Sequence, residues 1–147
     1  MVKNVEKNEK KIRIKDEGVK TLFSQLESLC EGLIYVSETD APVTAFVSET
    51  DSLVGGNILQ QITGKMVDRI DEVSFANFFE RLTIVKDWYG DREKTQAKKF
   101  LDLQKLIEEN LSDLKVFRIG EIRIQIFAGG FDSRGRLMGI STNAVET

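Results

Sequence analysis

The sequence contains no histidine and a single cysteine, Cys30. Without histidine, the chain has no imidazole to activate a serine or cysteine nucleophile or to bind a transition metal. One cysteine excludes an internal disulfide and a cysteine zinc cluster, and we interpret Cys30 as a core residue because it lies among helically spaced leucines. Enzyme classes that depend on these groups are excluded, whereas chemistry carried by carboxylates, lysine, serine or tyrosine is not.

Long apolar runs and targeting signals are also missing. No segment approaches the roughly 18 consecutive apolar residues of a membrane-spanning helix, and the first residues are charged where a secretion signal is apolar. With 147 residues, 41% of them hydrophobic and 31% charged, the composition is typical of one soluble globular domain. We therefore expect a cytoplasmic protein that does not bind membranes, with a flexible charged extension at residues 1–20 and a domain at residues 21–147.

Positive charge is absent from residues 21–64, which hold six acidic residues. Residues 1–20 carry seven Lys or Arg and four acids, and the rest of the chain is balanced, so the net charge of −3 conceals a strongly negative segment. Such asymmetry favours a positively charged partner, although chance clustering on a solvated face is the simpler explanation from composition alone. The basic residues at the N-terminus are interleaved with acids, so we expect no direct binding of nucleic acid.

Hydrophobic periodicity predicts an α+β fold, in which helices cover a mainly antiparallel sheet. Leucines recur at helical spacing from Leu22 to Leu33, and a broad apolar face predicts a long helix that begins at Asp91 or Glu93 and reaches Leu114. Ser74 is a suitable N-cap for a helix between them. The β-rich runs are predicted strands, at residues 43–47, 66–70, 116–119, 121–127 and 137–146.

Two segments are predicted to be turns. Residues 37–42 contain Ser, Asp and Pro, which are typical turn residues. Residues 129–135 are rich in glycine and resemble a phosphate-binding loop in composition, but they lack its Gly-Lys-Ser/Thr ending and precede a strand instead of a helix. We therefore interpret the second segment as the turn of an antiparallel hairpin.

Four carboxylates of the acidic segment are candidates for chemistry. Glu38 and Asp40 belong to a Val-Ser-Glu-Thr-Asp sequence that recurs with Glu49 and Asp51, although the repeat is too short to indicate a repeat architecture. Such acids act in hydrolysis when a cleft tunes their pKa values differently, or bind a hard cation. The sequence shows neither a cleft nor the spacing of a calcium-binding loop, so both roles are secondary alternatives.

Two further features are candidates for partner binding. Trp88, the single tryptophan, lies between Asp87 and Tyr89; it is either an interface anchor or a core residue that closes the corner before the long helix. The sequence ends at Thr147, directly after the last predicted strand. The hydroxyl and carboxylate of Thr147 are hard donors suited to Mg²⁺ when the end is ordered, whereas a frayed end carries no function.

Four motifs occur in order along the chain, and together they resemble the nuclease A inhibitor family. They are Leu33–Asp40 followed by Pro42, Asp87–Tyr89, Arg118–Glu121, and the ending Gly139–Thr147. The resemblance runs from about Leu22 to Thr147, and residues 48–73 match less well. It implies an α/β/α sandwich that acts as a protein inhibitor of a sugar-non-specific DNA/RNA endonuclease of the ββα-metal type and is not an enzyme.

The resemblance also implies which residues meet the nuclease. Glu38 stands in for the scissile phosphate, the Thr147 hydroxyl reaches the catalytic Mg²⁺ of the nuclease, and Asp87 and Trp88 form a second contact patch. The inhibitor then needs no cofactor of its own and shares the divalent metal of its partner. The implied partner-binding residues are Glu38, Asp40, Asp87, Trp88, Glu146 and Thr147.

Two alternatives to this function stay open from the sequence. One is a cytoplasmic acidic interaction module for another basic partner, in which Thr147 is dispensable. The other is an enzyme with a concave pocket around Glu38 and Glu49 and raised pKa values. Because Glu49 repeats the surroundings of Glu38, it could also compete for the phosphate-mimicking role.

Overall fold

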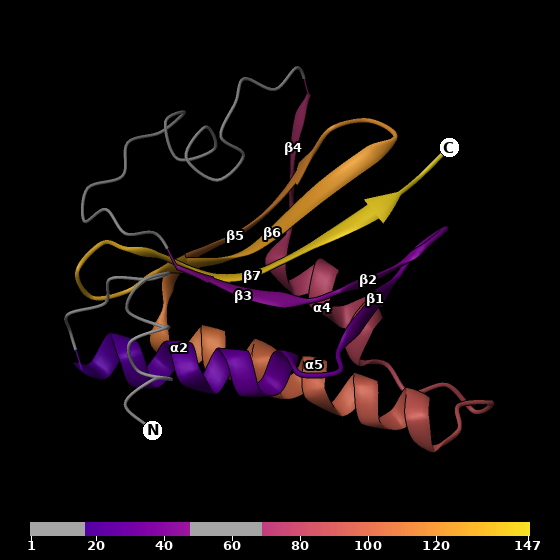
Figure 1. Ribbon diagram of the computed structural model, residues 1–147, viewed down its shortest axis with the longest axis horizontal. Coiled ribbons are helices and arrows are strands. Elements are labelled where there is room, and N and C mark those ends of the chain that lie inside the picture. The colour runs from indigo at the N-terminus through magenta and orange to yellow at the C-terminus, as the bar shows by residue number, and fades with distance from the viewer. Residues whose placement is uncertain (1–16, 48–68) are drawn as a thin grey trace, which may run out of the picture.

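The computed structural model describes residues 17–47 and 69–147 of the chain (Figure 1). The helices of this part are α2 (Glu17–Cys30), α4 (Phe75–Thr83) and α5 (Asp91–Asn110). The strands are β1 (Ile34–Val36), β2 (Asp40–Pro42), β3 (Thr44–Val47), β4 (Ile70–Val73), β5 (Ser112–Ile119), β6 (Arg123–Phe131) and β7 (Leu137–Val145). No helix within these residues is long and apolar enough to cross a membrane.

The strands form two sheets, and all their pairings are antiparallel. The larger sheet has the order β3-β7-β6-β5-β4, and the smaller one is the β1–β2 hairpin. The two contact each other because β1 and β2 lie beside β7. Antiparallel strands with separate helices confirm the predicted α+β fold.

One hydrophobic core joins α2, α4 and α5 to a single face of the larger sheet. Ile124, Ile126 and Ala128 of β6 point into this core at alternate positions, as a half-buried strand requires. Phe79 and Leu103 contribute fully buried side chains from the helices, each of which stabilises the fold by about 1.5–3 kcal/mol. The described helices thus form a single layer against the sheet (Figure 1), and the second helical layer that the resemblance implies is not among the described residues.

The starts of α4 and α5 are each fixed by a local hydrogen bond. Ser74 caps α4 as predicted, since its Oγ accepts a hydrogen bond from the Asn77 N–H at 3.2 Å. The second helix begins at Asp91, also as predicted, and the carboxylate of Glu93 accepts a hydrogen bond from the Gly90 N–H at 3.0 Å. The connection at residues 84–90 is therefore fixed at its junction with α5.

The long helix is shorter than its apolar periodicity predicts. It ends at Asn110, and β5 begins at Ser112, so the prediction that the helix reaches Leu114 is wrong. Asp113 has a positive φ of 54°, a conformation that no helix contains. Leu111 and Leu114 still pack on the core from their new positions, which explains why the periodicity continues past the end of the helix.

The predicted hairpin of the last two strands is present, but its turn is shorter than predicted. Gly129 and Gly130 belong to β6, and the turn comprises only the residues between β6 and β7. A Cβ atom on Gly129 would lie 2.1 Å from the Met138 carbonyl oxygen. Glycine is needed here for close approach of two strands and not for turn geometry.

Several sequence predictions fall partly or wholly outside the described residues. These are the first sixteen residues of the charged extension, most of the strand predicted at 66–70, and the carboxylates of Glu49 and Asp51. Within the described part, β4 begins at Ile70 and α2 begins at Glu17, four residues before the predicted domain boundary.

Candidate partner-binding site

The segment that carries Glu38 is a hairpin, and only its tip is a turn. The turn comprises Ser37–Thr39, whereas Asp40–Pro42 forms β2 and pairs with β1, so the turn predicted at 37–42 is too long. Pro42 fits in this strand because it lies opposite Ile34 at a position whose nitrogen points away from β1. The hairpin places Glu38 at an exposed tip.

The tip of the hairpin is tied to the end of β7. Ser37 Oγ accepts a hydrogen bond from the Val145 N–H at 3.1 Å and donates one to the Thr39 carbonyl at 2.9 Å. The Glu38 N–H donates to the Val145 carbonyl at 3.3 Å. Further along, the Thr142 hydroxyl donates to the Pro42 carbonyl at 2.9 Å. These bonds fix the position of Glu38 relative to the C-terminal residues.

Glu38 and Thr147 are in direct contact. The Thr147 N–H donates to Glu38 Oε2 at 2.8 Å, and the Thr147 hydroxyl lies 3.0 and 3.1 Å from the two carboxylate oxygens. Both residues are exposed. The structure thus brings together two predicted site residues that are separated by 109 positions in the chain.

Glu146, another predicted site residue, holds the C-terminal segment from its other side. Its backbone N–H donates to the Ile122 carbonyl at 2.9 Å, and its carboxylate forms an ion pair with Arg118. The last two residues are therefore held by contacts to three different segments, and they do not form a frayed end. The carboxylate of Glu146 is half-exposed and already partnered.

Trp88 is not a core residue. Its side chain is 72% exposed in the connection between α4 and α5, so the core alternative is wrong. The Trp88 ring contacts the Tyr89 ring edge-on, with centroids 4.8 Å apart, and Lys86 Nζ lies 6.0 Å from the Trp88 centroid. Asp87 beside it is also exposed. Figure 1 shows this connection, the β1–β2 turn and the C-terminus at the same end of the molecule.

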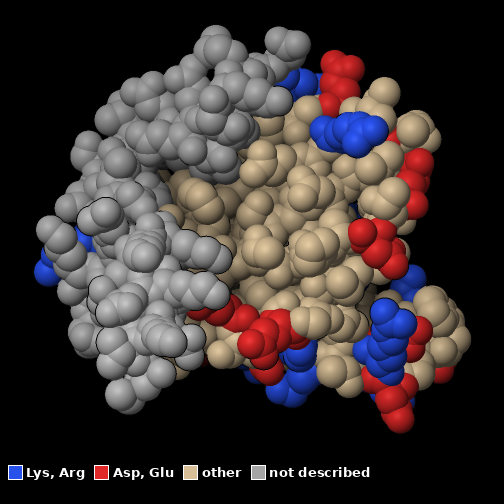
Figure 2. Space-filling model, in the orientation of Figure 1, with Lys and Arg blue, Asp and Glu red and all other residues tan. Residues whose placement is uncertain are grey.

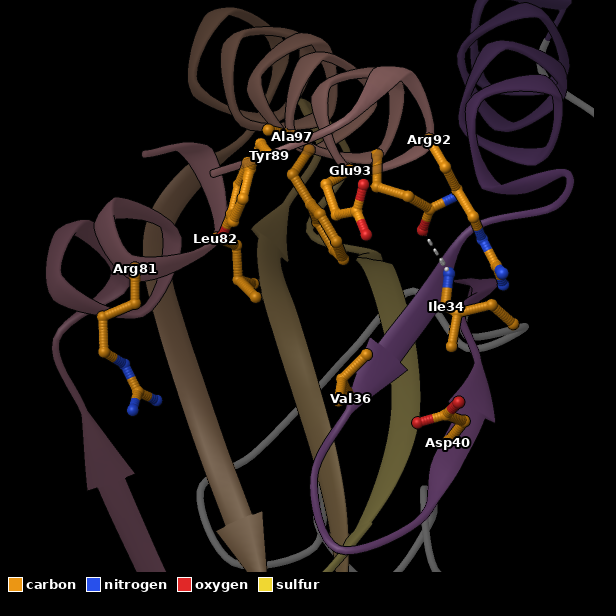
Figure 3. A pocket seen from close by; sticks show the side chains of 11 residues that line it. Ile34, Val36, Asp40, Arg81, Leu82, Tyr89, Arg92, Glu93 and Ala97 are labelled. Carbon is orange, nitrogen blue, oxygen red and sulfur yellow. Dashed lines mark hydrogen bonds between the residues drawn. The ribbon is translucent and has the colours of Figure 1, made fainter. Parts of the chain in front are cut away.

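A cleft of about 330 Å³ lies between the hairpin and the α4–α5 corner (Figure 3). Ile34, Val36 and Asp40 line it from the hairpin, and Leu82 and Tyr89 line it from the opposite side. Its polar lining also includes charged and amide side chains from the two helices, namely Arg81, Arg92, Glu93 and Gln96. The predicted contact Asp40 thus lies on one side of the cleft, and Tyr89, the neighbour of the predicted contact Trp88, lies on the other.

Sequence reasoning missed two residues that build this end of the molecule. Ser37 joins the hairpin to β7, as described above. Gln96 joins it to α5, because its Oε1 accepts a hydrogen bond from the Ile34 N–H and its Nε2 donates to the Gly32 carbonyl, both at 2.9 Å. Neither residue has a sequence signal of its own, since serine is common in turns and glutamine is common on the polar face of a helix.

The charges of the described residues do not form one acidic surface. Glu27 and Glu31 lie on or just after α2, whereas Glu38 and Asp40 lie in the hairpin. Figure 2 shows uncharged side chains at the centre of one face, with acidic and basic side chains interspersed around its rim. Among the described acids of residues 21–64, Glu38 and Asp40 are the two that lie in the exposed hairpin.

The arrangement gives little support to catalysis by this chain. Glu38 is exposed at a hairpin tip, and it lines neither the cleft described above nor the groove between α2 and α5. Burial, with a smaller contribution from the nearby charge of Glu27, raises the pKa of the Cys30 thiol to about 12 against the opposing effect of Lys99, so Cys30 is an inert core thiol. In residues 17–47 and 69–147, no group of three or more His, Cys, Asp or Glu is placed to hold a metal.

Comparison with known proteins agrees with the family that the sequence motifs resemble. A family model described as nuclease A inhibitor-like protein matches residues 20–147. Among curated proteins, no significant match to the chain was found. The matched residues comprise both the Glu38–Thr147 contact and the exposed Trp88, and they cover most of the sequence. The chain therefore belongs to the nuclease A inhibitor-like family, whose general role is the inhibition of a nuclease.

Proposed function

We propose that this protein inhibits a sugar-non-specific DNA/RNA endonuclease of the ββα-metal type by occupying its active site. The observation that carries this proposal is the contact between Glu38 and Thr147, which presents a carboxylate and a hydroxyl together at one exposed end. An active site of this type binds an anionic phosphate next to a divalent cation. A carboxylate replaces the phosphate, and a hydroxyl oxygen is a ligand that Mg²⁺ accepts.

The hydrogen bond between the two residues prepares the Thr147 hydroxyl for this role. The hydroxyl donates its single proton toward the carboxylate of Glu38, so the lone pairs of its oxygen are directed away from Glu38. These lone pairs suit a cation, which requires an acceptor and not a donor. In this proposal Thr147 contributes the oxygen that meets the Mg²⁺ of the nuclease, and the chain itself needs no metal or cofactor.

Electrostatics and the exposed tryptophan supply the rest of the interface. Glu38 and Asp40 give the hairpin negative charge, which speeds encounter with a cationic cleft at low salt. Trp88 with its neighbour Asp87 supplies an apolar anchor beside a charge. The protein acts by occupancy and not by catalysis. The proposal includes a cytoplasmic location, which the unpaired Cys30 supports.

Titration against a nuclease tests this function. We expect the purified protein to protect plasmid DNA from a sugar-non-specific ββα-metal endonuclease in Mg²⁺ buffer, with complete protection near one inhibitor per nuclease. A mobility-shift assay with the same plasmid and no nuclease is expected to show no binding, which separates inhibition from shielding of the DNA. Unprotected plasmid at a micromolar excess of inhibitor would contradict the proposal for that nuclease.

Trp88→Ala is expected to weaken inhibition without changing stability. Removal of an interface tryptophan costs about 2 kcal/mol or more, which is about thirtyfold in the inhibition constant. Because Trp88 is largely exposed in the free protein, its truncation leaves the core intact, and thermal unfolding followed by circular dichroism is expected to give the same midpoint. Trp88→Phe keeps an aromatic ring and is expected to lose less affinity. Unchanged inhibition by Trp88→Ala would remove this residue from the interface.

A further inference from the structure

The outer edge of β1 has peptide groups that the hairpin does not use. Hydrogen-bonded and non-hydrogen-bonded pairs alternate along antiparallel strands. The Leu33 carbonyl accepts from the Val43 N–H at 3.0 Å, and the Ser37 N–H donates to the Thr39 carbonyl at 2.9 Å. The backbone hydrogen bonds to β2 are therefore made at residues 33, 35 and 37. Ile34 and Val36 direct their N–H and C=O groups away from β2.

The side chain of Gln96 occupies the first part of this edge as a strand would. Its amide accepts from the Ile34 N–H and donates to the Gly32 carbonyl, which is how one peptide group of a neighbouring strand would pair with β1. The next groups along the edge are the Ile34 carbonyl and the N–H and C=O of Val36. They have no hydrogen-bond partner among the described residues. Strand-like pairing therefore stops after one peptide unit.

The cleft opens beside these unpaired groups. Val36 lies on one of its sides and Leu82 and Tyr89 lie on the other (Figure 3). In the described part of the chain, four of the six exposed large apolar side chains belong to β1 or to the α4–α5 connection, namely Val36, Ile84, Val85 and Trp88. Proteins avoid an open strand edge next to exposed apolar side chains unless a partner covers them.

We propose that the outer edge of β1 docks an extended segment of the nuclease, which enters the cleft and pairs with Ile34 and Val36 as a third strand. The identity of the partner rests on the proposed function. The hairpin that carries Glu38 forms one side of the cleft, and Tyr89, the neighbour of Trp88, lines the other, so a nuclease that contacts both Glu38 and Trp88 lies across these two sides. Within the cleft, Asp40 and Glu93 offset Arg81 and Arg92, so the attraction for basic side chains of the segment comes from the exposed Glu38 at the tip of the hairpin. A second copy of this chain fits less well, because edge-to-edge pairing would bring the two acidic hairpins together.

Two substitutions at Val36 separate the role of its peptide group from that of its side chain. Val36→Pro removes the outward N–H, and proline is tolerated where a strand nitrogen faces solvent. Val36→Thr keeps both the N–H and a β-branched side chain of similar size. We expect Val36→Pro to weaken nuclease binding about tenfold or more, whereas Val36→Thr stays within about threefold of the unmodified protein. Circular dichroism of both variants checks that they fold.

Amide hydrogen exchange in the unmodified protein provides a test that needs no substitution. We expect nuclease binding to slow exchange of the Val36 N–H at least about tenfold, because a buried strand hydrogen bond protects an amide. The exposed Ser133, in the turn between β6 and β7, is the control and is expected to exchange at the same rate. Hydrogen exchange at Val36 decides whether the β1 edge binds the nuclease if Val36→Pro fails to fold, or if the exchange and substitution experiments disagree.

The outcomes distinguish this proposal from the proposed function. Unchanged exchange at Val36, in a complex that still inhibits the nuclease, would overturn the docking edge and leave the inhibitory function standing. Slowed exchange at Val36 together with weaker binding of Val36→Pro supports the docking edge. Failure of the unmodified protein to bind the nuclease would overturn both.

Discussion

Replacement of Glu38 by alanine is expected to weaken nuclease inhibition about a thousandfold. Loss of one partner of a desolvated charge pair at an interface costs about 2–5 kcal/mol, and about 4 kcal/mol corresponds to this factor. Two losses add up here. The nuclease loses the anion that fills its phosphate position, and Thr147 loses the acceptor of its N–H and hydroxyl hydrogen bonds. Inhibition constants from plasmid digestion, with thermal unfolding as the check on folding, measure the effect.

Glu38→Gln and Glu49→Gln are the matched variants for this experiment. Glu38→Gln keeps the shape of the side chain and one acceptor oxygen, so it isolates the contribution of charge, and we expect an effect smaller than that of alanine. Glu49 occupies the same place in the repeated Val-Ser-Glu-Thr-Asp sequence, and Glu49→Gln is expected to inhibit like the unmodified protein. A large loss in Glu49→Gln with none in Glu38→Gln would transfer the phosphate-mimicking role to Glu49.

Extension of the chain beyond Thr147 is expected to abolish inhibition at micromolar concentration. Thr147 is held against Glu38, and Glu146 is held by Arg118 and Ile122, so added residues project from the site into the space that the nuclease must fill. A short Gly-Ser extension after Thr147 is the variant, and the same extension before Met1 is its control. We expect the control to inhibit normally. Full inhibition by the C-terminal extension would contradict active-site occupancy by Thr147.

Substitution of Thr147 itself refines the same test. Thr147→Ser keeps the hydroxyl and is expected to inhibit within about threefold of the unmodified protein, whereas Thr147→Val has the same shape without the hydroxyl and is expected to lose about tenfold or more. If the protein is instead an acidic module for another basic partner, neither the extension nor Thr147→Val changes binding. Titration of the Thr147 variants against the nuclease therefore distinguishes a nuclease inhibitor from an acidic interaction module.

Local sequence signals predicted the elements of this fold well where they acted alone. Ser74 marked the start of α4 because a serine cap is a local hydrogen bond, and α5 was found from the apolar face of its own residues. The predicted element boundaries were wrong where tertiary packing, and not local sequence, determines the role of a residue. Leu114 continues a helical pattern from within a strand, and Gly129 serves a close strand contact that no single segment reveals.

The sequence predicted which residues form the site, but it did not predict the hydrogen bonds that hold them together. Glu38, Trp88 and Thr147 came from motifs that resemble a family, and the structure places their segments at one end of the molecule. The direct bond between Glu38 and Thr147, the tie from Ser37 to Val145 and the amide of Gln96 join segments far apart in the chain. Such contacts leave no periodicity or spacing in the sequence, so only the folded arrangement shows them.

The separation of Glu38 and Thr147 also has a consequence for folding. Their contact closes a loop that contains most of the chain, which is entropically costly, and it requires β7 to be already placed in the sheet. Partially folded chains that have the helices and the β1–β2 hairpin lack the paired carboxylate and hydroxyl. Nuclease inhibition is therefore expected to recover during refolding only after β7 has joined the sheet, and it would report this step.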